Sequence, residues 1–67
     1  MQQPRLTARE TEVLQAIADG HPNHEIAVLL AIREPTVKTY MVRLLARLSA
    51  RTRAHAVTIG FRNHLIQ

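Results

Sequence analysis

The pattern of apolar and polar positions predicts four short helices. Apolar residues recur at helical spacing in segments of about 7–19, 23–31, 34–48 and 52–63, and no segment alternates with a period of two. The third segment is the longest. Its residues Val37, Met41, Leu44 and Leu48 fall on one stripe, and its opposite side is mostly polar or basic. We therefore expect a compact all-α domain of four helices over residues 1–67.

Residues with strong positional preferences mark where these helices begin and end. Thr7 and Glu10 have the spacing of a capping box, so the first helix should begin at Thr7. Gly20 is suited to end that helix, and Asn23 is a favoured N-cap for the second. Pro35 falls in the first turn of the third helix, where proline is tolerated.

The connection between the second and third helices is short and predicts a helix-turn-helix. Only Ala31 to Arg33 separate them. The second helix should bury Ile26, Leu29 and Leu30. In a helix-turn-helix the second helix of the unit enters the major groove of DNA, which is about 12 Å wide.

The positive charge lies almost entirely in the second half of the chain. From Arg33 onward the net charge is +6, whereas the first 32 residues carry −2. The basic residues of this half are Arg33, Lys38, Arg43, Arg47, Arg51, Arg53 and Arg62. Such a distribution favours the phosphate backbone of nucleic acid as a partner. With two aromatic residues in the chain, binding of single strands by base stacking is not expected.

Composition excludes several other classes. The chain has no cysteine, so it can form neither a disulfide nor a thiolate metal site, and a cytoplasmic location is expected. The longest apolar run, Ile26 to Ile32, is far too short to cross a membrane.

The residues resemble the LuxR/GerE-type DNA-binding domain, found at the C-terminus of NarL/FixJ-type response regulators. The matching positions are Leu6-Thr7-x-Arg9-Glu10-x-Glu12-Val13-Leu14, Ala18-x-Gly20, Asn23-x-Glu25-Ile26-Ala27-x-x-Leu30, Ile32-x-x-x-Thr36-Val37-Lys38, Leu48, Arg53 and Leu65-Ile66. The resemblance implies a central helix-turn-helix, major-groove binding by the third helix, and pairing of two domains through the fourth. It also implies that the chain is a sequence-specific, double-stranded DNA-binding domain that regulates transcription.

The resemblance also implies roles for individual residues. Lys38, Thr39 and Val42 match base-facing positions, Thr36 and Tyr40 match positions near the DNA backbone, and Arg43 and Arg47 follow on the same helix. Three residues depart from the family pattern. Arg33 stands where the family usually has a serine or threonine N-cap. A DNA phosphate bound at that helix end would make the positive charge of Arg33 favourable. Tyr40 replaces a histidine, and His64 replaces a glycine.

The sequence also allows other interpretations of the basic helix. Lys38, Arg43 and Arg47 would also suit the solvated face of any amphipathic helix. Region 4 of a sigma factor has a similar helix-turn-helix, although the Thr7-x-x-Glu10 opening and the Leu65-Ile66 ending favour the LuxR type. A helical protein–protein adaptor would explain the fold but not the +6 segment.

No enzymatic chemistry, metal or other cofactor, or small-molecule substrate is expected. Glu10, Glu12 and Glu25 suit helix capping and ion pairing better than paired carboxylate catalysis, and Glu10 is expected to pair with Arg53. His21 and His24 are two candidate metal ligands without a visible third.

The fourth helix has more apolar residues than one face can bury. Ala54, Thr58 and Phe61 follow at i, i+4 and i+7, so they share a side and form a candidate homodimer patch. The alternative is a scatter of ordinary exposed apolar residues. RNA polymerase is a further candidate partner of the domain.

Overall fold

Four helices account for most of the chain. The computed structural model describes residues 5–67, so Met1 to Pro4 of the predicted domain lie outside the described residues. The helices are α1 (Ala8–Ala18), α2 (Asn23–Leu30), α3 (Glu34–Leu48) and α4 (Arg53–Arg62), and no strand occurs in residues 5–67. The all-α prediction is confirmed, with every helix bound within one residue of the expected position.

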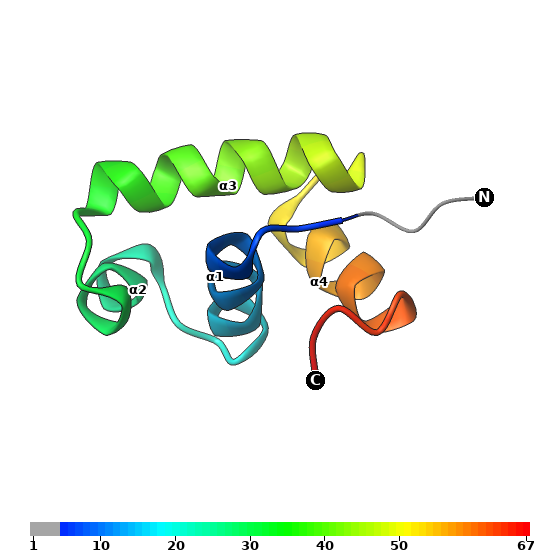
Figure 1. The fold of residues 1–67 in the computed structure, drawn as a ribbon, viewed down its shortest axis with the longest axis horizontal. Coiled ribbons are helices and arrows are strands. Elements are labelled where there is room, and N and C mark those ends of the chain that lie inside the picture. The colour runs from blue at the N-terminus through cyan, green and yellow to red at the C-terminus, as the bar shows by residue number, and fades with distance from the viewer. Residues whose placement is uncertain (1–4) are drawn as a thin grey trace.

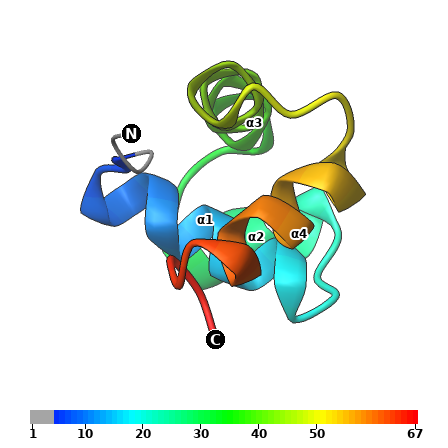
Figure 2. The same ribbon diagram turned by 90° about the vertical axis from the view of Figure 1, so that its right-hand side faces the viewer.

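The helix α1 lies at the centre and contacts each of the other three. Figure 1 shows α3 running along one side of the molecule, with α1, α2 and α4 gathered beneath it. Figure 2, which views α3 end on, shows that one side of this helix faces away from the rest of the chain. The packing thus leaves the longest helix half covered.

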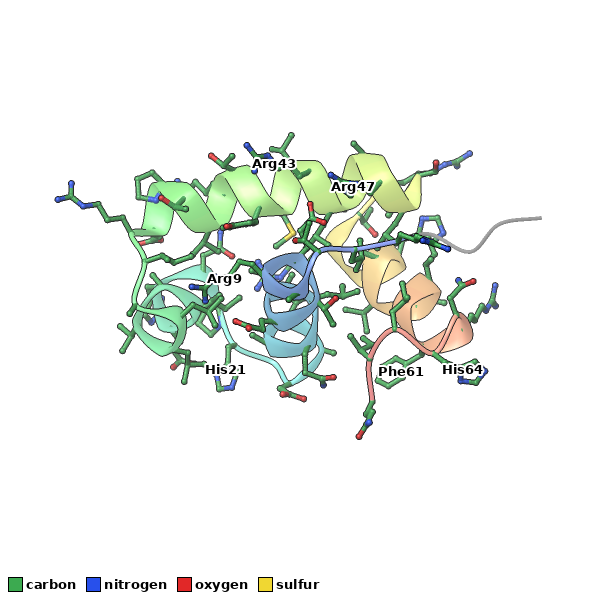
Figure 3. All side chains as sticks on the ribbon, in the orientation of Figure 1. Arg9, His21, Arg43, Arg47, Phe61 and His64 are labelled. Carbon is green, nitrogen blue, oxygen red and sulfur yellow. The ribbon has the colours of Figure 1, made fainter. Side chains whose placement is uncertain are left out.

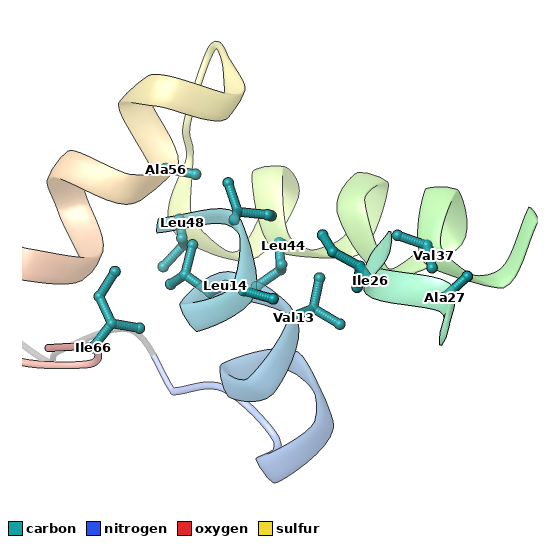
Figure 4. Close-up of a cluster of buried hydrophobic side chains, with 11 residues drawn as sticks. Val13, Leu14, Ile26, Ala27, Val37, Leu44, Leu48, Ala56 and Ile66 are labelled. Atoms are coloured by element: carbon teal, nitrogen blue, oxygen red, sulfur yellow. The ribbon is translucent and has the colours of Figure 1, made fainter. Parts of the chain in front are cut away.

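Eleven buried side chains from all four helices and the C-terminal segment form one core (Figure 4). They are Val13, Leu14, Ala16, Ile17, Ile26, Ala27, Val37, Leu44, Leu48, Ala56 and Ile66. The predicted stripe of α3 is confirmed, because Val37, Leu44 and Leu48 are buried and Met41 is partly buried. Gly60 lets α4 approach closely, since a Cβ there would meet side-chain atoms of Leu14 and Ile66 at 3.0 Å.

Every helix is followed by a residue in the left-handed conformation. These residues are Gly20, Ala31, Ser49 and His64, with φ of 92°, 54°, 52° and 56°. At each end the next N–H donates to a carbonyl five residues back, as in Leu65 to Gly60 at 2.8 Å. The left-handed His64 gives a physical reason for the glycine that the family usually has there.

Two expectations about α2 are wrong. The helix begins after Pro22, whose carbonyl accepts from the N–H groups of Glu25 and Ile26 at 3.0 Å. Asn23 is therefore not the N-cap, and its Oδ1 instead accepts from Arg53 Nη1 at 2.7 Å. Leu29 is not buried but 59% exposed, because Ile26 and Ala27 form the buried side of this short helix.

Glu10 is a buried carboxylate that joins α1 to α3. Its Oε1 accepts from the Thr7 N–H at 2.8 Å, and its N–H donates to Thr7 Oγ1 at 3.1 Å, so the predicted capping box is present. Its Oε2 accepts from Arg47 Nε at 2.9 Å. The prediction that Glu10 pairs with Arg53 is wrong, because the guanidinium of Arg53 donates to Asn23 and to the His21 carbonyl.

The surroundings of Glu10 favour its charged form. Burial raises the pKa of this carboxyl, but the hydrogen bond from the Thr7 N–H and the charge of Arg47 outweigh burial and lower the pKa below its ordinary value. A lowered pKa in the folded state means that the charged carboxylate stabilises the fold. This contribution is present above the unfolded pKa and is lost as the pH falls through the folded value.

We expect Leu44→Ala to lower the free energy of unfolding by about 2–5 kcal/mol, because it leaves a cavity in the centre of the core. Val42→Ala, on the exposed side of the same helix, is the matched control and should change stability by about 0.5 kcal/mol or less. Urea denaturation followed by circular dichroism measures both. Equal midpoints for the two variants would contradict the assignment of the buried stripe.

We expect Glu10→Gln to be less stable than the parent at neutral pH, and to lose less of its stability on acidification. The reason is that the substitution removes the carboxylate whose lowered pKa links folding to pH. Thermal unfolding between neutral and acid pH measures the difference. Glu12→Gln removes an exposed carboxylate and serves as the control. Parallel pH profiles for Glu10→Gln and the parent would show that Glu10 contributes nothing to the acid sensitivity.

Candidate nucleic-acid interface

The turn between α2 and α3 has the hydrogen bonding that a helix-turn-helix requires. Ala31 is left-handed, and the Ile32 N–H donates to the Ala27 carbonyl at 3.0 Å, so α2 ends abruptly. Arg33 is extended, and its carbonyl accepts from the N–H groups of Thr36 at 3.0 Å and Val37 at 3.2 Å. The chain thus changes direction within three residues. The helix-turn-helix predicted from the short connection is present.

The side of α3 opposite the buried stripe is exposed along its whole length. The exposed residues there are Lys38, Thr39, Val42, Arg43, Ala46 and Arg47. Val42 is 68% exposed, so its methyl groups are free to contact a ligand. Figure 3 shows Arg43 and Arg47 on this helix, on the side of the molecule away from His21 and His64. The structure therefore brings the three base-facing candidates, Lys38, Thr39 and Val42, onto one free surface.

These three side chains differ in what they can offer a base. Lys38 has an ammonium group with three donors, and Val42 offers two methyl groups. The Thr39 hydroxyl donates to the Pro35 carbonyl at 3.2 Å. With its proton engaged within the helix, this hydroxyl is left as an acceptor, suited to an exocyclic amino group of adenine or cytosine.

Tyr40 and Arg43 lie next to each other on α3. Tyr40 is partly buried and packs against the core, so only part of its ring is available to a ligand. The guanidinium carbon of Arg43 lies 6.0 Å from the centre of the Tyr40 ring. A cation over an aromatic face at this distance is weakly attracted to it. Arg43 itself stays exposed and forms no ion pair within residues 5–67.

The remaining backbone-contact candidates lie toward the two ends of α3. Arg33 and Thr36 are exposed at its start, and the Arg33 side chain makes no capping hydrogen bond, as expected for a residue without an acceptor. Arg47 lies at the other end, with its side chain 51% exposed and its Nε engaged by Glu10. One edge of this guanidinium is thus held by α1 while its exposed part faces solvent.

Arg53 has a structural position that sequence spacing did not reveal. Its two terminal nitrogens donate to Asn23 Oδ1 at 2.7 Å and to the His21 carbonyl at 2.8 Å, which ties α4 to the start of α2. One guanidinium on α4 thus binds both the first residue of α2 and a carbonyl in the loop before it. Arg53 is one of the positions that match the family pattern, but spacing does not reveal its partners, because the contact with Asn23 spans 30 residues.

The candidate dimer residues Ala54, Thr58 and Phe61 are all exposed on α4. The Thr58 hydroxyl donates to the Ala54 carbonyl at 3.3 Å, so it is satisfied within the helix and its methyl group is free for apolar contact. Phe61 is 48% exposed. The three side chains therefore form a small, largely apolar surface, the α4 patch.

The structure adds two observations on other classes of site. No group of three potential ligands that could hold a metal ion occurs among residues 5–67, and His21 Nδ1 instead lies 3.0 Å from Glu25 Oε1. None of the described helices has the length and apolar character needed to span a bilayer.

Comparison with known proteins identifies the family. Residues 4–59 match the family described as "Bacterial regulatory proteins, luxR family". The chain is 44% identical over 61 residues to YxjL of Bacillus subtilis (strain 168), an uncharacterized transcriptional regulatory protein. This match covers 91% of the chain and 28% of YxjL. It is also 44% identical over 62 residues to the response regulator protein VraR of Staphylococcus aureus (strain Mu3) and of Staphylococcus epidermidis. Each match covers 92% of this chain and 30% of VraR.

The chain thus spans less than a third of the length of these curated relatives. The family match, by contrast, covers well over half of the chain and includes the whole helix-turn-helix. It selects the LuxR type over a sigma factor and over an adaptor, as the resemblance implied. The chain belongs to the luxR family of bacterial regulatory proteins, as a non-enzymatic helix-turn-helix DNA-binding domain that regulates transcription.

Proposed function

We propose that α3 binds in the major groove of double-stranded DNA and reads its sequence. The observation that carries this proposal is the uninterrupted exposed face of α3, which has Lys38, Thr39 and Val42 in the first nine of its 15 residues. An α-helix with its side chains is about 10–12 Å across, which matches a groove about 12 Å wide. The other helices pack behind α3 and do not obstruct its approach (Figure 2).

The residues along α3 suggest a division between base readout and phosphate contact. Lys38 can donate to guanine N7 and O6, Thr39 can accept from an amino group, and Val42 can contact a thymine methyl. Residues proposed to contact the backbone are Thr36, Tyr40, Arg43, Arg47 and Arg33. Of the two arginines within α3, Arg43 is the stronger candidate for a phosphate, because Glu10 engages Arg47 whereas no carboxylate in residues 5–67 pairs with Arg43.

We further propose that two copies of the chain pair on DNA through the α4 patch. Exposure of Phe61 and the internally satisfied Thr58 hydroxyl support this, and two-fold operators commonly match two-fold proteins.

Residues 1–67 would act as a single domain. We propose that this domain is the effector part of a response regulator and acts in the cytoplasm, and the similarity to the response regulator VraR supports this. Contact with RNA polymerase stays a prediction.

Replacement of Lys38 by alanine should reduce the discrimination between specific and random DNA. A good base contact is worth about 1–3 kcal/mol of discrimination, so the ratio of the two affinities should fall by about tenfold or more. Competition binding against a duplex selected from random DNA and a scrambled duplex measures this ratio. Equal losses on the two duplexes would remove Lys38 from the base-reading residues.

Replacement of Arg43 by alanine is the matched test of phosphate contact. This variant should weaken binding to both duplexes alike and reduce the log–log salt slope by about 0.9, as expected for one phosphate contact. Arg47→Ala should act in the same direction but also lower stability, because it leaves Glu10 buried without its cation. An unchanged salt slope in Arg43→Ala would contradict the proposed contact.

Introduction of a charge into the α4 patch should abolish cooperative binding. Phe61→Glu places a carboxylate at the centre of the proposed dimer contact, where desolvation of two like charges opposes pairing. Titration of duplexes with one and with two half-sites measures the cooperativity. Val28→Glu, which introduces the same charge at an exposed apolar position on α2, is the control. Cooperative binding by Phe61→Glu equal to that of the control would contradict pairing through α4.

A further inference from the structure

The side of the molecule opposite the exposed face of α3 has an apolar groove, away from the surface proposed to bind DNA. Val28 is 80% and Leu29 59% exposed on α2, and they are two of the four large exposed apolar side chains in residues 5–67. A groove of about 610 Å³ is lined by Leu29, Leu30 and Leu65, and a second of about 350 Å³ by Val28 and Leu29. Leu29 and His21 line both grooves, so the two form one continuous surface, the Leu29 groove.

The rim of the Leu29 groove is acidic. Glu12 and Asp19 line the larger part, and Glu25 lines the smaller. No lysine or arginine lines either part within residues 5–67. This fits the net charge of −2 on the first 32 residues, against +6 on the remainder. A DNA backbone or an acidic protein would be repelled here, and a basic segment would be attracted.

The acidic side chains are available to a new partner at small cost. Glu12 pairs with Arg9 at 3.0 Å and Glu25 with His21 at 3.0 Å, and both carboxylates are 52% exposed. Exposed pairs of this kind contribute only about 0–1 kcal/mol, so an arriving lysine or arginine can replace or share them easily. The rim can therefore contribute to binding at little cost in stability.

The C-terminal segment that lines the groove is fixed in position in the free chain. Gln15 Nε2 donates to the Gln67 carbonyl at 2.8 Å, and the Gln67 N–H donates to Gln15 Oε1 at 2.9 Å. This pair fixes the C-terminal segment against α1, with Ile66 buried and Leu65 facing the groove. A preformed surface costs less entropy to bind than one that must be ordered.

We propose that the Leu29 groove docks an amphipathic segment of a protein partner, with leucine- or isoleucine-sized anchors flanked by lysine and arginine. Figure 3 shows His21 and His64, which line the groove, on the opposite side from Arg43 and Arg47. The partner can therefore bind in the Leu29 groove while α3 is bound to DNA. The acidic rim selects for basic flanks, and the exposed leucine selects for apolar anchors.

A selection from displayed random 16-residue peptides tests this directly. The library is selected on the 67-residue chain and depleted on Leu29→Ser, and the enriched peptides are then synthesised and titrated by fluorescence anisotropy. Enriched peptides should combine two or more large aliphatic residues with several lysines or arginines. Loss of one buried leucine contact should weaken their binding by about tenfold or more in Leu29→Ser.

Matched variants separate the contributions of shape and charge. Glu12→Gln combined with Asp19→Asn should weaken the peptides and reduce the salt dependence of their binding, whereas Val42→Ser, on the exposed face of α3, should leave their affinity unchanged. Random duplex should bind Leu29→Ser as it binds the parent, which keeps this test distinct from that of DNA binding. Because Leu29 is exposed, Leu29→Ser should also retain the parent's thermal unfolding midpoint.

Several outcomes would overturn the proposal. The proposal is wrong if no peptide is enriched on the parent chain relative to Leu29→Ser. It is also wrong if the enriched peptides lack basic flanks. Peptides whose affinity falls with Val42→Ser would place their site on α3. If sedimentation shows that the free chain self-associates and that Leu29→Ser abolishes this, the groove is occupied by a second copy and not by a basic partner.

Discussion

The fold depends on the burial of one stripe of α3. A helix of 15 residues is marginal in water by itself, so α3 is stable because Val37, Leu44 and Leu48 pack against the other helices. A chain of 67 residues has too few apolar side chains to cover both sides of its longest helix. The opposite side is therefore left free, and the surface proposed to read DNA follows from the way in which the core is closed.

Two polar contacts fix how this surface is presented. The Glu10–Arg47 pair joins the start of α1 to the end of α3, and the hydrogen bonds of Arg53 join α4 to the start of α2. Both involve partners that are distant in sequence, so they restrain the orientation of the helix-turn-helix and not only its local conformation. The same packing leaves an acidic, apolar face on the far side of the molecule. The chain thus has two surfaces of opposite charge, separated by α1.

The sequence predicted the features that depend on local spacing. The capping box at Thr7 and the stripe of α3 were found because each is set by residues within a few turns of one another. The partner of Glu10 was missed because Arg47 and Arg53 both lie more than 35 residues away, and spacing does not choose between them. Leu29 was misplaced because the run from Ile26 to Ile32 is apolar throughout and shows no periodicity. The base and phosphate roles on α3 depend on a DNA complex and stay predictions.

Chemical-shift mapping of the DNA contact shows most directly whether α3 is the DNA-binding helix. The isotope-labelled chain is titrated with a duplex selected for tight binding, and amide shifts are followed along the whole sequence. We expect the largest shifts from Arg33 to Arg47, together with unchanged amides around Leu29 and Leu65 on the opposite side. Shifts concentrated on α2 or on the C-terminal segment, with α3 unaffected, would contradict it.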